Sequence, residues 1–362
     1  MLRIPAALLL SLLLASSLFA QSDQPASSAK PHPAPEALTE AALREVINHD
    51  FRELERLLLA GNETKTFMAK AAADHLPLWQ RAEKLDWPEA LCLMARCRYY
   101  GVSTPVDYPL AMATYKKAAD AGQPLAMWSV GVMYEEGRGV DKDYAESMAW
   151  FRKSADAGPA LGLESIGYLY EKGRGVPIDY KEAMTWYRKA AEAGCLYAMA
   201  HIGNLYENGL GVDKDYHEAL VWYRKAAEAG SSSGAMHIGL LYYDGHGVGQ
   251  DYKQAMVWFR KAADAGYPPA MNWVGLLYDK GSGVPQDYKE ALAWHRKSAE
   301  AGDRTGMECV AYFYEKGLSV PKDYEEALTW YYAALEAGNK NAGDRANNLA
   351  EKIRKAKERP DH

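Results

Sequence analysis

The sequence has few cysteines, little phenylalanine and no excess of basic residues. Among 362 residues there are 4 Cys and 6 Phe, although Tyr and Trp number 25 and 10. Lys and Arg total 42 against 48 Asp and Glu, so the formal net charge is −6. A general nucleic-acid-binding protein would need a basic surface, which this charge balance argues against. Beyond the first 20 residues, no apolar run reaches the length of a transmembrane helix.

The first 20 residues have the pattern of a secretory signal peptide. Arg3 supplies a basic start, residues 6–14 are almost wholly apolar, and small residues precede a cleavage position after Ala20. This pattern predicts an exported bacterial protein, periplasmic or secreted, with no transmembrane anchor after cleavage. An uncleaved N-terminal anchor is the alternative. Residues 21–35 are rich in Ser, Ala, Gln and Pro and are expected to form a disordered spacer.

A 36-residue repeat fills most of the remaining chain. The dipeptide Asp-Tyr returns at intervals of 36 residues, and Ala-Gly follows each copy at a fixed offset. The Asp-Tyr pairs begin at Asp107, Asp143, Asp179, Asp215, Asp251, Asp287 and Asp323. Copies without insertion or deletion indicate one structural unit repeated along the chain rather than separate globular domains.

The second helix of each unit begins after its Asp-Tyr pair. Asp179 is a good N-cap, and Glu182 is expected to return a hydrogen bond to the backbone N–H of the cap. Apolar residues then recur at helical spacing, and Gly194 can take the left-handed conformation that stops the helix. The predicted buried stripe consists of Ala183, Trp186, Tyr187 and Ala190.

The first helix of each unit carries an Ile-Gly-Tyr stripe, here Ile202, Gly203 and Tyr206. Because Gly203 has no side chain, a neighbouring helix can approach it closely. Gly209 and Gly211 suit positive φ values in the link to the second helix. This Gly-x-Gly link recurs between helices in almost every unit, which favours a turn over a phosphate loop. Stacked helix pairs share one core, so the predicted fold is an all-α, right-handed α-solenoid of 36-residue helix-turn-helix repeats.

The repeat resembles the Sel1-like repeat, a relative of the tetratricopeptide repeat with a longer link between its helices. The resemblance rests on the pattern Ala-x-x-x-(Ile/Val)-Gly-x-Leu-Tyr-x-x-Gly-x-Gly-Val-x-x-Asp-Tyr-x-x-Ala-x-x-Trp-Tyr-x-Lys-Ala-Ala-x-Ala-Gly. It covers residues 71–338 in about seven to eight units. The edges depart from it: Thr114 replaces the Trp, Ala311 the helix glycine and Ser319 the second link glycine. The resemblance implies a non-catalytic scaffold or adaptor that binds other proteins, with bacterial relatives associated with host interaction, envelope assembly and signalling.

Two flanking regions are expected to shield the ends of the solenoid. Residues 36–70 are interpreted as N-terminal capping helices, because apolar periodicity runs from residue 38 to residue 59. Residues 339–362 are interpreted as a polar capping helix followed by a tail.

The predicted partner-binding residues lie on the first helices, which line the concave surface of tetratricopeptide-like solenoids. They are aromatic and aliphatic in the middle and acidic along one rim, which suits an extended or helical protein segment with apolar anchors and basic flanks. They are Trp128, Val132, Glu135, Glu164, Tyr168, Glu171, Asn204, Glu207, Met236, Tyr243, Asn272, Asp279, Glu308, Tyr312 and Glu315. The absence of Lys and Arg from these columns argues against a clamp for an acidic C-terminus. The alternative is a solvated acidic face with apolar packing between repeats.

No set of residues indicates catalysis, a metal or a cofactor. His201 and His237 occupy equivalent positions in adjacent units, but about 10 Å separates such units and no convergent carboxylate is expected, so packing or surface roles are favoured. Cysteine-rich relatives have been described as β-lactamase-like, and such an enzyme, or a peptidoglycan-acting one, is the alternative function. The Ser-x-x-Lys sequence of residues 27–30 lies in the spacer, away from any rigid helix.

The cysteines do not follow the repeat, unlike those of the cysteine-rich relatives. We therefore expect free buried thiols. They are Cys92, Cys97, Cys195 and Cys309.

Overall fold

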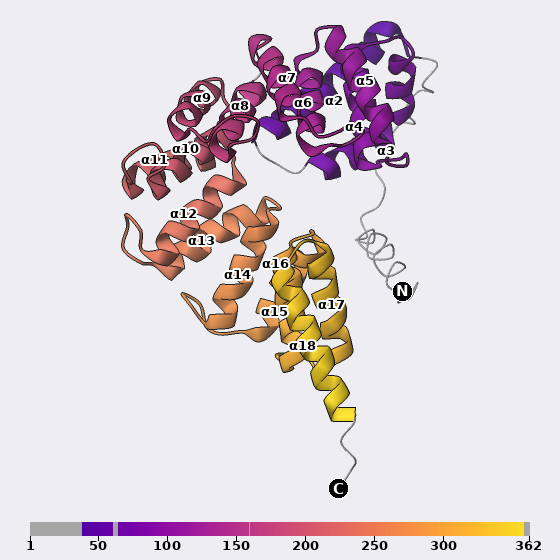
Figure 1. Ribbon diagram of the computed structural model, residues 1–362. Helices are drawn as coiled ribbons and strands as arrows, with labels where there is room; N and C mark the ends of the chain where they lie inside the picture. The colour runs from indigo at the N-terminus through magenta and orange to yellow at the C-terminus, as the bar shows by residue number, and fades with distance from the viewer. Residues whose placement is uncertain (1–37, 61–63, 159, 358–362) are drawn as a thin grey trace, which may run out of the picture. The chain divides into compact units, whose positions relative to one another are not determined.

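The computed structural model describes residues 38–60, 64–158 and 160–357 (Figure 1). The predicted signal peptide (1–20) and spacer (21–35) lie outside these ranges. The chain divides into two compact units, residues 1–39 and residues 40–362, and the helices of the described ranges all belong to the second. None of these helices combines the length and apolar character needed to cross a membrane.

The helices follow one another in pairs, as the 36-residue period predicts. Two longer helices come first, α2 (Glu40–Ala60) and α3 (Thr64–Glu83). The first helices of the repeats are α4 (Pro88–Tyr100), α6 (Pro124–Glu136), α8 (Ala160–Lys172), α10 (Leu196–Asn208), α12 (Ser232–Asp244), α14 (Pro268–Lys280) and α16 (Arg304–Lys316). The second helices are α5 (Tyr108–Asp120), α7 (Tyr144–Asp156), α9 (Tyr180–Glu192), α11 (Tyr216–Glu228), α13 (Tyr252–Asp264), α15 (Tyr288–Glu300) and α17 (Tyr324–Glu336), and α18 (Lys340–Lys357) ends the series.

Each helix packs against its neighbours along the chain, both within a repeat and between repeats (Figure 1). The repeat helices have 13 residues each, a length at which an isolated helix is marginal in water. Packing between helices therefore supplies most of their stability. The predicted all-α solenoid is confirmed.

The start of each second helix is fixed by its aspartate and by the preceding helix. Asp179 Oδ1 accepts hydrogen bonds from the backbone N–H groups of Lys181 and Glu182, both at 3.0 Å. The N–H of Asp179 itself donates to the carbonyl oxygen of Tyr170 at 3.0 Å. The predicted return bond from the Glu182 side chain is therefore wrong, because α8 already uses that donor. The bond to Tyr170 ties the second helix to the last turn of the first.

The link between the two helices uses the glycines that the sequence indicates. Gly209 and Gly211 have φ values of 68° and 71°. A Cβ atom on Gly211 would lie 2.7 Å from Cβ of Tyr180, so this glycine lets the link pass against the preceding repeat. Ser319 takes the same place in the last repeat with φ 58°, and its Oγ donates to the Tyr288 carbonyl oxygen at 3.1 Å.

The glycine in the middle of α6, α8, α10, α12 and α14 allows an aromatic ring of the second helix to pack directly on the backbone of the first. A Cβ atom on Gly203 would lie 2.6 Å from the ring of Tyr223, which is fully buried. Burying such a ring contributes on the order of 2–3 kcal/mol. The expected close approach of helices at this glycine is confirmed.

The ends of the repeat array are covered by α2, α3 and α18. Asp50 on α2 is buried, accepts a hydrogen bond from Trp79 Nε1 at 2.8 Å and lies 2.8 Å from Nδ1 of His75. These contacts fix α2 on α3. The boundary expected between the N-terminal capping helices and the repeats, at residues 70 and 71, falls inside α3. Helix α2 also contacts α4, α8 and α10. At the other end, Leu349 of α18 packs in one cluster with Tyr331.

Candidate functional site

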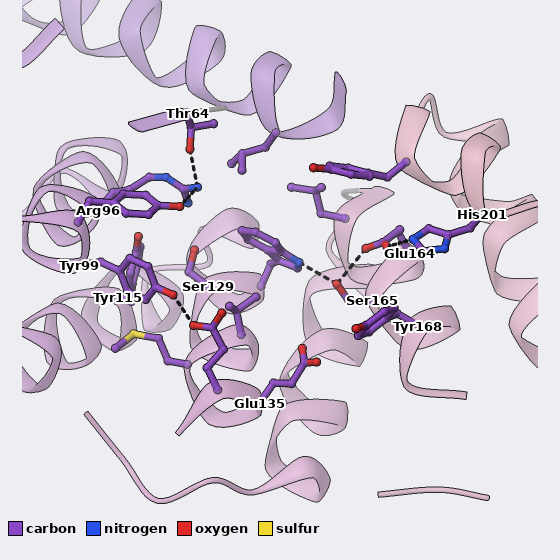
Figure 2. A pocket seen from close by; sticks show the side chains of 18 of the residues that line it. Thr64, Arg96, Tyr99, Tyr115, Ser129, Glu135, Glu164, Ser165, Tyr168 and His201 are labelled. Carbon is purple, nitrogen blue, oxygen red and sulfur yellow. Dashed lines mark hydrogen bonds and ion pairs between the residues drawn. The ribbon is translucent and has the colours of Figure 1, made fainter. Parts of the chain in front are cut away.

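A cavity of about 620 Å³ lies along the first helices of the N-terminal repeats (Figure 2). Its walls come mainly from α4, α6, α8 and α10, and Leu58 at the end of α2 and Thr64 at the start of α3 also line it. The cavity brings together five of the residues expected to bind a partner. These are Trp128, Val132, Glu135, Glu164 and Tyr168.

A chain of hydrogen bonds crosses the wall of the cavity from α6 to α10. Trp128 Nε1 donates to Ser165 Oγ at 2.9 Å, and Ser165 Oγ donates to Glu164 Oε2 at 3.3 Å. His201 Nε2 lies 3.3 Å from Glu164 Oε1 (Figure 2). Three successive repeats are thereby joined by side chains whose orientations are fixed before any partner arrives.

His201 lies between two carboxylates. Its Nδ1 is 3.3 Å from Glu171 Oε2, on the side opposite Glu164. Burial favours the neutral imidazole, but hydrogen bonds to Glu164 and Glu171 outweigh it and raise the pKa of His201 to about 9. The expectation that no carboxylate lies close to the equivalent residues His201 and His237 is therefore wrong for His201. The described residues nevertheless contain no group of three or more His, Cys, Asp or Glu side chains arranged to hold a metal ion.

Glu171 was expected to face a partner, but it is buried with 6% of its surface exposed. It accepts hydrogen bonds from Tyr187 at 2.7 Å and from Lys172 at 2.5 Å. Burial alone would raise the pKa of Glu171, but hydrogen bonds from His201, Lys172 and Tyr187 lower it to about 2. This carboxylate stabilises the contact between repeats, and its placement on the exposed rim is wrong.

The acidic rim is largely neutralised by residues of the same chain. Arg174, in the link after α8, pairs with Glu135, and Lys316 pairs with Glu315 at 2.6 Å. Arg345 of α18 pairs with Glu308 at 3.1 Å. A basic partner would therefore compete with internal cations at these positions.

The remaining predicted residues lie outside the large cavity. Glu207 accepts a hydrogen bond from Tyr223 at 2.7 Å, and Tyr243 makes an edge contact with Trp273 at 5.1 Å between ring centroids. Tyr312 and Glu315 line a second cavity, of about 320 Å³, beside α18. The other members are partly buried on α10, α12 and α14. They are Asn204, Met236, Asn272 and Asp279.

The cavity also contains polar residues that the sequence prediction missed, on α4 and α5. Arg96, Tyr99, Tyr100 and Tyr115 line its N-terminal part. Arg96 precedes Val132 by one repeat length of 36 residues. Arg96 is therefore the residue of the first repeat that is equivalent to Val132. The predicted set of equivalent residues started at Val132, and including the preceding repeat would have found Arg96.

The four cysteines carry free thiols in the structure. Cys195 is fully buried, and burial raises its thiol pKa to about 12. Burial likewise raises the pKa of Cys97 to about 12. These thiols are unreactive core groups at neutral pH.

In a comparison with known protein families, the sequence matches the Sel1 repeat over most of the repeat region. The matched segments are residues 88–123, 124–159, 160–195, 196–231, 232–267, 268–303 and 309–339. No curated protein matches the sequence.

Several solved structures are similar to this chain. A Sel1 repeat protein from Oxalobacter formigenes is 35% identical, with a TM-score of 0.57 over 67% of this chain and 98% of that one. A protective antigen of uropathogenic Escherichia coli with an SLR fold is also 35% identical, over 89% of this chain and 68% of its own, with a TM-score of 0.49. Yeast Tom70, at 12% identity and a TM-score of 0.57 over 90% of this chain and 68% of its own, shares the fold alone.

Proposed function

The chain belongs to the Sel1 repeat family, and we propose that it is a non-catalytic scaffold that binds a protein or peptide partner on the face formed by its first helices. The observation that carries this proposal is the cavity of about 620 Å³ along α4, α6, α8 and α10. Trp128 and Tyr168 present aromatic surface to it, and aromatic side chains of this kind anchor protein interfaces.

The rigidity of the cavity wall supports the same proposal. Trp128 and His201 are held through Ser165 and Glu164 in one hydrogen-bonded chain. Because these side chains are already ordered, little conformational entropy is lost when a partner docks.

Affinity capture tests the proposed face. Tagged protein carrying Tyr168→Ala and Tyr243→Ala is compared with wild type and with Val221→Ala, a change at a 43% exposed residue of α11 on a second helix. We expect the double variant to capture at least tenfold less of a partner that wild type and Val221→Ala both capture. An unchanged set of partners in the double variant would remove this face from consideration.

An exported location fits the signal-peptide pattern of the first 20 residues. N-terminal sequencing of the protein from its native cell tests it. A mature chain that starts at Gln21 agrees with export. A chain that still carries residues 1–20 contradicts cleavage after Ala20.

The alternative of a β-lactamase-like or peptidoglycan-acting enzyme is tested separately. The cavity carboxylates Glu135 and Glu164 are engaged by Arg174 and His201, and the Ser165 hydroxyl that donates to Glu164 also accepts a hydrogen bond from Trp128. We expect purified protein to leave nitrocefin and isolated peptidoglycan unchanged. Turnover of either substrate would replace the scaffold proposal with the enzymatic one.

A further inference from the structure

Arg96 is a buried arginine whose positive charge has no carboxylate partner among the described residues. It is 6% exposed, and its Nη2 donates to Thr64 Oγ1 at 2.9 Å and to the hydroxyl of Tyr100 at 3.3 Å. Its Nε is buried and has no hydrogen-bond partner. Two positions along α4, Arg98 shows the usual arrangement, an ion pair with Glu83 at 2.6 Å.

A buried guanidinium without a carboxylate partner is costly, because burial removes water from the charge and the ring of Tyr100, whose centroid lies 5.2 Å from Arg96 Cζ, replaces only part of that stabilisation. Such a group is stabilised when an anion binds beside it. Arg96 lines the large cavity, and Figure 2 shows its guanidinium reaching from α4 toward the interior of that cavity. An anion bound at this end of the cavity would lie beside the guanidinium.

The surroundings of Arg96 are rich in hydrogen-bond donors. The hydroxyl-bearing residues Thr64, Tyr100 and Tyr115 line the same part of the cavity, whereas the hydroxyl of Ser129 there already donates to the Leu125 carbonyl oxygen at 2.9 Å. Thr64 is also the first residue of α3, a helix of 20 residues whose N-terminus carries partial positive charge. Burial raises the pKa of Tyr115, so its hydroxyl stays protonated at neutral pH. A planar guanidinium with neighbouring hydroxyls suits a carboxylate, which accepts two parallel hydrogen bonds.

We propose that this end of the cavity binds the C-terminal carboxylate of the partner segment, with Arg96 as the residue that recognises it. This inference rests on the proposed scaffold function and names the chemistry of its partner. Thr64, whose Oγ1 accepts a hydrogen bond from Arg96, is the first residue of α3 and bounds the cavity there, so a segment whose last residue reaches Arg96 ends against the start of α3.

The charges elsewhere in the cavity favour a chain end over an acidic sequence. Glu135, Glu136 and Glu164 line the part beyond Arg96. Arg174, Arg138 and His201 already pair with these carboxylates and so offer no free cation to a segment with several acidic side chains, whereas a segment whose one anionic group is its terminus needs only Arg96. Lys and Arg are absent from the predicted partner-binding positions from Trp128 onward, but one repeat earlier Arg96 occupies the position equivalent to Val132, where it can hold a terminal carboxylate.

The test uses the full chain with selectively ¹⁵N-labelled arginine, so that arginine Nε–H groups are seen directly by NMR. Arg96→Lys identifies the Arg96 resonance by removing it. Three N-acetylated probes of the same length are titrated: a Leu-Tyr-Leu peptide with a free C-terminal carboxylate, its C-terminal amide, and an amidated Leu-Asp-Leu peptide. The last probe offers a side-chain carboxylate in place of a terminal one.

We expect a saturable shift of the Arg96 Nε–H with the free-acid peptide and at least tenfold weaker binding of both amides. Arg188→Gln, at an exposed arginine of α9, should leave the titration unchanged, and Tyr100→Phe, which removes one hydroxyl, should weaken it several-fold. Equal responses to acid and amide, no response at millimolar peptide, or a stronger response to the aspartate peptide would overturn the proposal. Each of these results leaves the capture experiment at Tyr168 and Tyr243 free to support the scaffold function on its own.

Discussion

The imidazole of His201 stacks on the ring of Tyr187, with centroids 4.6 Å apart and planes inclined by 7°. Tyr187 belongs to the second helix of one repeat and His201 to the first helix of the next. The same contact joins His237 to Tyr223 at 4.6 Å and Trp273 to Phe259 at 5.3 Å. At these three boundaries a stacked ring pair connects the core of a repeat to the face proposed to bind a partner.

Replacing His201 by Phe should destabilise the protein in a way that depends on pH. The folded-state pKa of about 9 lies above the ordinary histidine value of 6.5, so the charged histidine stabilises the fold fully below pH 6.5 and loses that contribution as pH rises through 9. We expect His201→Phe, which keeps the ring, to cost about 1–3 kcal/mol at pH 6. Urea unfolding of both proteins between pH 6 and 10 measures the difference, which should shrink above pH 9. A constant difference would mean that the pairing with Glu164 and Glu171 contributes little.

His295 should have the opposite effect. Burial lowers the pKa of His295 to about 4, so the unfolded chain binds a proton more readily than the folded one. Stability associated with this residue is present above pH 6.5 and is lost as pH falls toward 4. His295→Phe introduces the ring that Phe259 supplies one repeat earlier, and should reduce acid destabilisation by about 1–3 kcal/mol. Thermal unfolding at pH 7 and pH 4.5 tests this. An equal loss of stability in wild type and variant would show that other groups dominate.

Gly203→Ala should destabilise the fold although alanine is the better helix former. An added methyl group would lie 2.6 Å from the buried ring of Tyr223, which has little room to move. We expect a loss of about 1–3 kcal/mol, the usual range for overpacking. Gly249→Ala is the matched control, because no atom lies within 4 Å of a Cβ added there. The comparison uses urea midpoints. Equal midpoints for the two variants would contradict close packing at Gly203.

The thiols should react only after unfolding. Cys92, Cys97 and Cys195 are buried, and burial raises the pKa of each. We expect slow modification of these three by a thiol reagent at pH 8 in the native protein, with Cys309, which is partly exposed, the fastest. In denaturant all four should react. Mass spectrometry counts the modified sites, and a disulfide that persists in denaturant would contradict the structure.

Much of the fold is predictable because the residues that begin, end and pack each helix lie within the repeat itself. Asp179 caps a helix, Gly211 needs a positive φ, and Gly203 leaves space for a ring, and each requirement recurs every 36 residues. The path of α2 is different. Its contacts with α8 and α10 join segments more than one hundred residues apart, and a periodicity within residues 38–59 carries no information about them.

The cavity was only partly predictable for a related reason. Helical spacing placed Trp128 and Tyr168 on one face, and both line the cavity, but pairing between repeats depends on how neighbouring helices stack. Glu171 was assigned to an exposed rim, whereas Tyr187 and His201 enclose it. Internal charge pairs of this kind follow from three-dimensional register, which the repeat length alone does not fix.

Site-specific photocrosslinking in the native cell tests most directly whether the first-helix face binds a partner. A photoreactive phenylalanine analogue replaces Tyr168 in the cavity or, as control, Val221 on α11. The account predicts a discrete crosslinked protein from position 168 that is absent from position 221. Crosslinks of equal yield from both positions, or from position 221 alone, would contradict the assignment of the partner to this face.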